Sequence, residues 1–111
     1  MSVPRSVTFR VETSGEPLSK RAPSIDENGD ALSDFMVIFP GLREKPAPFI
    51  RETIDTVHGI LASYHHAVVF AEFNLKLNLL WVSIRPISGL RFEIAGALQE
   101  QVPNARLISH I

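Results

Sequence analysis

The chain has 111 residues, with 11 basic and 12 acidic side chains and a formal net charge of −1. This near-balance offers no net electrostatic attraction for the phosphate backbone of a nucleic acid. The absence of cysteine excludes disulfides, thiol nucleophiles and cysteine-ligated metal or iron–sulfur sites. A hydrophobic content of 45% with 21% charged residues is typical of one folded domain over residues 1–111 and not of a disordered chain.

Residues 1–13 are expected to form an N-terminal strand extension. Apolar and polar side chains alternate over residues 7–12, which is the period of a half-buried strand. Residues 14–32 lack periodicity and are rich in Ser, Glu, Pro and Gly, which predicts a long mobile loop. The acidic run 26–30 inside that loop departs from the spacing of a calcium loop, so we expect a solvated turn there.

From residue 33 onward the pattern predicts strand, helix, strand, strand, helix, strand. This order predicts an α+β, ferredoxin-like split βαβ core over 33–111, with a four-stranded antiparallel sheet and both helices on one face. Pro48 suits the first turn of the first helix, and Ser88 is the expected N-cap of the second. The elements are placed at 34–39, 50–61, 67–73, 79–84, 90–98 and 106–111.

The turn between the second and third core strands is bracketed by Asn74 and Asn78. The sequence does not fix the register of this hairpin. A two-residue turn pairs Phe70 with Trp81, whereas a longer turn pairs Ala71 with Trp81.

The two central strands carry large apolar side chains on both alternations, although the helices cover only one face of the sheet. One apolar set on each strand therefore faces away from the helices and leaves a patch of roughly 400–600 Å². A second copy of the chain, its own N-terminal segment or a partner is expected to cover this patch, and we favour a homodimer. The expected binding residues are Phe35, Val37, Phe70 and Trp81.

A possible anion or ligand site lies at the start of the second helix, where Arg85, Ser88 and Gly89 come together in the sequence. Backbone N–H groups at a helix N-terminus bind anions, but a simple cap with a tight turn accounts equally for these residue types.

Three histidines are candidate metal ligands. His65 and His66 are adjacent on a predicted strand and so point to opposite faces, while His110 lies near the opposite edge of the sheet. We expect these histidines to be structural or solvent-exposed, and no metal site.

The sequence therefore predicts a small cytoplasmic binding module of unknown ligand that acts as a homodimer through its apolar sheet face. It holds no secretory signal, no membrane-spanning stretch and none of the common catalytic or cofactor motifs, so no cofactor is expected. The alternative is a small dimeric α+β enzyme for an apolar molecule, with His65, His66, Glu72 or Arg85 as its polar groups. The third option is an RNA-binding sheet, which the scattered basic residues disfavour.

Overall fold

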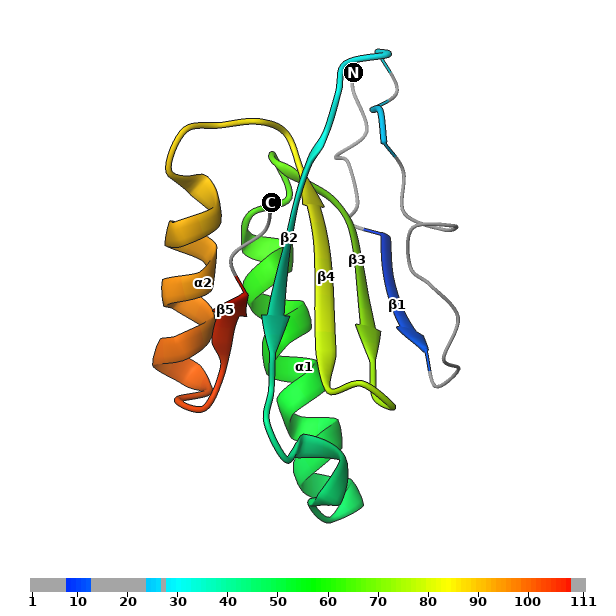
Figure 1. Ribbon diagram of the computed structural model, residues 1–111, viewed down its shortest axis with the longest axis vertical. Helices are drawn as coiled ribbons and strands as arrows, with labels where there is room; N and C mark the ends of the chain where they lie inside the picture. Colours follow the sequence, from blue (N-terminus) through cyan, green and yellow to red (C-terminus); the bar gives the residue numbers. More distant parts are fainter. Residues whose placement is uncertain (1–7, 13–23, 27, 109–111) are drawn as a thin grey trace.

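The structure, a computed structural model, describes residues 8–12, 24–26 and 28–108. These residues form two α-helices and one five-stranded mixed sheet (Figure 1). Neither helix is long and apolar enough to cross a bilayer within the described ranges. The strands are β1 (Thr8–Glu12), β2 (Ser33–Ile38), β3 (Val68–Asn74), β4 (Leu79–Ile84) and β5 (Arg106–Ile108), and the helices are η2 (a 3-10 turn, Leu42–Glu44), α1 (Ala47–Ser63) and α2 (Leu90–Gln101).

The strand order across the sheet is β1-β3-β4-β2-β5. Strands β2, β3, β4 and β5 pair with their neighbours in antiparallel fashion, whereas β1 pairs with β3 in parallel. The sheet is thus five-stranded and mixed, and the expectation of a purely antiparallel four-stranded sheet needs this correction. The reason is that β3 would otherwise end the sheet with unpaired N–H and C=O groups, which β1 (blue in Figure 1) satisfies.

Both helices pack on the same face of the sheet, and β2 and β4 cross in front of α1 in Figure 1. Each helix buries one side against the sheet, with Val57 and Leu61 of α1 and Ile94 and Leu98 of α2 fully buried. The core between the two layers is formed by fully buried side chains, chiefly Phe35, Val37, Val57, Leu61, Phe73, Leu80, Val82, Ile94 and Leu98.

Prolines mark the start of α1 and the end of α2, whereas the start of α2 differs from the expectation. Pro48 lies in the first turn of α1, and α2 ends at a C-cap on Val102, directly before Pro103. The prediction of Ser88 as the N-cap of α2 is wrong, because Gly89 holds that position with φ 77° and without any side-chain capping bond. A positive φ suits glycine, which has no Cβ, so the backbone of Gly89 makes the turn.

Both registers expected for the β3–β4 hairpin are wrong, since Trp81 pairs with Glu72. The loop between the strands is four residues long, 75–78, and Asn78 adopts a left-handed φ of 55°. The side-chain carbonyl of Asn74 accepts a hydrogen bond from the Leu77 N–H at 3.1 Å and stabilises the turn. Strand β3 therefore extends to Asn74, one residue beyond the end at residue 73 that the sequence predicts.

Candidate functional site

The face of the sheet opposite the helices, which we call the helix-free face, carries a continuous row of apolar side chains. On β2 and β4 these alternate with the buried core residues, so they point away from the helices. The register places Met36 between Trp81 and Ile108, and Ile38 beside Leu79. All five side chains are half-buried. We refer to Met36, Ile38, Leu79, Trp81 and Ile108 as the apolar strip.

Two of the four residues expected on this face lie there. Trp81 belongs to the apolar strip, and Phe70 points to the same side but is only 5% exposed. Phe35 and Val37 instead point toward the helices with exposures of 0% and 1%, so they are core residues and their expected place on the binding face is corrected.

The sequence contained a signal for the correct side of β2. Both alternations of this strand are apolar in the middle, but Asp34 has the same parity as Met36 and Ile38. A charged side chain favours the less covered face of a half-buried sheet, since burying a charge is costly. On β4, the polar Ser83 has the same parity as Trp81 and indicates that Trp81 also points away from the helices.

Polar side chains connect neighbouring strands around the apolar strip. The indole N–H of Trp81 donates to the Ser83 hydroxyl at 3.3 Å, and that hydroxyl donates to the Asp34 carboxylate at 3.1 Å. Further along the face, the fully buried Glu72 carboxylate lies 3.8 Å from the Arg10 guanidinium of β1. These contacts hold the strip in one orientation.

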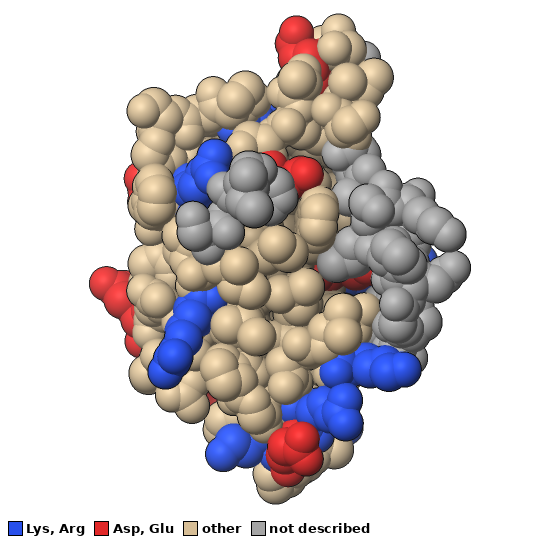
Figure 2. Space-filling view, in the orientation of Figure 1, with Lys and Arg blue, Asp and Glu red and all other residues tan. Residues whose placement is uncertain are grey.

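Figure 2 shows the helix-free face from the front. Uncharged side chains cover most of the middle of the sheet, and lysine and arginine are most numerous at the lower end of the view. Other basic side chains lie singly on the left of the view, so the coloured part of this face shows no continuous basic track across the strands.

Arg85 forms a contact that differs from the expected anion site. Its guanidinium donates to the Asp26 carboxylate and, at 3.3 Å, to the carbonyl oxygen of His66. The Asp26 side chain is only 3% exposed and also accepts bonds from the N–H groups of Asn28 and Asp30. The expected turn at 26–30 is therefore present, but its first carboxylate is buried against Arg85, whereas a solvated turn was expected.

Ser88 and Gly89 are not partners in that ion pair. They line a hollow of about 420 Å³ in front of α2, together with Arg91 and Phe92, and Arg85 is not one of its lining residues. The structure therefore brings together two of the three residues expected at the anion site.

The histidine pair lies in a turn and not on a strand. His65 and His66 are exposed between α1 and β3, with ring centroids 6.3 Å apart, and His110 lies outside the described residues. No group of three histidine, aspartate or glutamate side chains suited to a metal ion occurs in the described ranges. A third histidine, His58, stacks on Phe9 of β1 at 4.6 Å and so joins α1 to the edge strand.

The polar groups expected for an enzyme do not meet in any of three cavities. Three cavities lined by described residues have volumes of about 200, 260 and 420 Å³. None of these three is lined by His65, His66, Glu72 or Arg85.

A scan against protein-family models found no match for the chain. Searches of curated proteins and of solved structures likewise found none. The geometry of the molecule is therefore the basis for a functional proposal.

Proposed function

We propose that the chain is a small binding module that associates with a second copy of itself through the apolar strip. The observation that carries this proposal is the continuity of five half-buried apolar side chains over three adjacent strands. Completing their burial against a second copy is favourable by about 25 cal/mol for each Å² of apolar surface removed from water.

The charges beside the strip favour a second copy as the occupant. Asp34 lies near the start of β2, and the exposed Arg106 pairs with Ile38 at its other end, both on the helix-free face. A two-fold axis passing near Met36 brings Arg106 of each copy toward Asp34 of the other. Such a self-complementary arrangement of opposite charges is what a symmetric dimer requires.

We further propose that the segment from β2 to β5 is a ferredoxin-like unit to which β1 has been added. Its support is the order of the elements, strand-helix-strand-strand-helix-strand, and the antiparallel pairing of the four strands. In this unit the helices cover one face only, which leaves the opposite face available for association.

Sedimentation or light scattering over a micromolar to submillimolar concentration series tests the dimer. The native chain is expected to give twice the mass of one chain at the high end of the series. Met36→Glu introduces a charge into the middle of the strip and is expected to shift the protein to the monomer. Acrylamide quenching of Trp81, the single tryptophan, should weaken as the native dimer forms.

The matched control is Phe92→Glu, which adds the same charge at an apolar side chain that is 66% exposed on α2. This variant should remain dimeric, and circular dichroism should show both variants folded. A native chain that stays monomeric throughout the series, or equal dissociation by both variants, overturns the proposal.

A further inference from the structure

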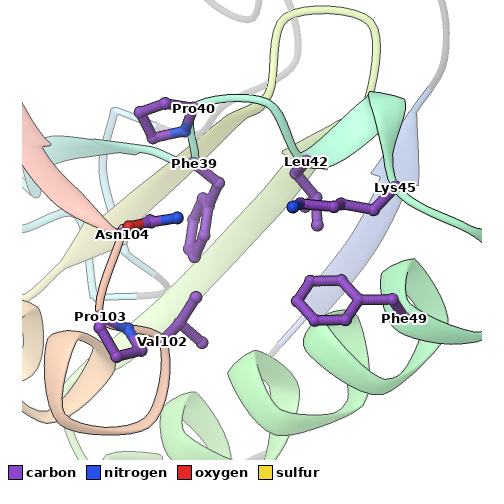
Figure 3. A pocket seen from close by; sticks show the side chains of 8 residues that line it. All are labelled: Phe39, Pro40, Leu42, Lys45, Phe49, Val102, Pro103 and Asn104. Atoms are coloured by element: carbon purple, nitrogen blue, oxygen red, sulfur yellow. The ribbon is translucent and has the colours of Figure 1, made fainter.

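A separate cavity lies away from the apolar strip, where the chain leaves β2 and where it leaves α2. Its volume is about 200 Å³, and Phe39, Leu42 and Val102 form apolar walls (Figure 3). Phe49 of α1 completes the enclosure and is 49% exposed, which is a high value for a large aromatic side chain. Since a cavity of about 150 Å³ lined by apolar side chains accepts a benzene ring, this space has the size for one small ring.

Lys45 is the one charged residue among those that line this cavity. Its ammonium lies 5.8 Å from the centre of the Phe49 ring, and in Figure 3 the side chain runs above that ring with its amine end directed toward the cavity. In the part of the chain that the structure describes, no carboxylate lies within salt-bridge distance of this ammonium. An anionic group entering the cavity would therefore meet a cation that has no competing partner there.

The start of α1 adds to this preference for an anion. The helix begins at Ala47 with no side-chain cap and no acidic residue in its first turn. The positive end of its dipole is therefore not neutralised locally, and it lies between Lys45 and Phe49 in the sequence. On the other side of Phe49, a neighbouring hollow of about 260 Å³ contains Glu52, which would repel a carboxylate. An anionic ligand thus has one favourable orientation, with its charge at Lys45.

We propose that this cavity binds a small apolar molecule, of the size of one ring, that carries a single carboxylate. The ring occupies the space between Phe39, Val102 and Phe49, and the carboxylate pairs with the Lys45 ammonium. The Asn104 side chain, which lies beside Phe39 in Figure 3, provides a second polar group among the lining residues. A mostly apolar site with a few placed polar groups is the usual composition of a small-molecule site.

Titration of the ¹⁵N-labelled protein with phenylacetate, followed by amide chemical shifts, tests this proposal. Phenylacetate is expected to shift the amides around the cavity, such as those of Leu42, Phe49 and Asn104, with millimolar affinity. The uncharged phenylacetamide and the cationic phenethylamine are expected to bind more weakly. Lys45→Gln should weaken phenylacetate binding by about fivefold and leave phenylacetamide binding unchanged.

The matched control is Lys76→Gln, which removes the same charge from an exposed side chain of the β3–β4 loop and should bind phenylacetate like the native protein. Equal affinity for phenylacetate and phenylacetamide, an equal effect of the two lysine variants, shifts centred elsewhere or no binding at all would overturn the proposal. The cavity does not include the apolar strip, so the monomeric Met36→Glu variant should bind phenylacetate normally, and the two proposals fail independently.

Discussion

Tyr64, the C-cap of α1, shows how one residue reports the packing of two helices. Partial burial raises the pKa of its phenol above the ordinary value of 10.0, because the phenolate is disfavoured away from water. A hydrogen bond with Glu93 and the negative charges of Glu93 and Glu100 raise this pKa further. Since the folded pKa lies above the unfolded one, the stability linked to this proton is complete below pH 10 and is lost as the pH rises through the folded pKa.

Tyr64 is the single tyrosine of the chain, so its alkaline titration can be followed directly by phenolate absorbance. The native protein is expected to titrate above pH 10, and Glu93→Gln should lower the pKa toward its ordinary value. Glu52→Gln, at an exposed position of α1, serves as the control and should not change it. A native pKa at or below 10, with the protein still folded, would contradict the packing of Tyr64 against α2.

At the scale of elements, the β3–β4 loop is fixed by one residue. Asn78 has a left-handed φ of 55°, its backbone carbonyl accepts a bond from the Phe39 N–H at 2.7 Å, and its side-chain carbonyl accepts one from the Arg43 N–H at 2.9 Å. Asn78→Ala removes the side-chain bond and adds backbone strain, so we expect a loss of about 2 kcal/mol in the free energy of unfolding. Urea denaturation measures this loss.

Asn78→Gly separates the two causes of that loss. Glycine adopts a positive φ without strain, so this variant should lose about 1 kcal/mol, for the side-chain hydrogen bond alone. Lys76→Ala, at an exposed site in the same loop, should leave the stability nearly unchanged. If Asn78→Ala proves as stable as the native chain, the loop does not hold the hairpin register as described.

The elements themselves were predictable from the sequence, but their pairing and some of their ends were not. Periodicity and prolines place all six core elements in order, because those signals are local. The four-residue loop 75–78 goes with the observed hairpin register, and its Asn78 also bonds to Arg43, which is distant in the sequence. The start of α2 depends on the positive φ of Gly89. The sequence favoured the neighbouring Ser88 as the N-cap, because serine is the more common residue at that position.

The candidate sites were predictable only in part, because they are assembled at the scale of the whole molecule. The sequence indicates that the central strands are apolar on both sides, and in the structure Trp81 lies on the face opposite the helices. On β2, Phe35 and Met36 are both large and apolar, and the parity of Asp34 is the one signal in that strand that separates their faces. The cavity beside Lys45 was missed, because its walls come from two segments, 39–49 and 102–104, that meet only after α1 and α2 pack together.

The parallel pairing of β1 divides the molecule into parts of unequal cooperativity. β1 is bonded to β3 alone, and the pairing of Thr8 with Phe70 closes a very long loop of chain. Loop closure of this kind costs entropy, and Phe9 is the one side chain of β1, among those described, that is not exposed. An edge strand with few buried contacts is therefore the first part of such a sheet to open.

Hydrogen exchange should then show two classes of backbone amide. Amides of β1 are expected to exchange through a local opening that leaves the other strands paired, whereas those in the middle of β4 should exchange only through global unfolding. Denaturant should accelerate exchange strongly in β4 and weakly in β1. Equal protection of the two strands would mean that β1 is an integral part of a single folding unit. If the two strands differ as expected, β1 is an edge strand that can separate from the sheet on its own. Its release would expose the outer backbone N–H and C=O groups of β3 while the remaining fold stays intact.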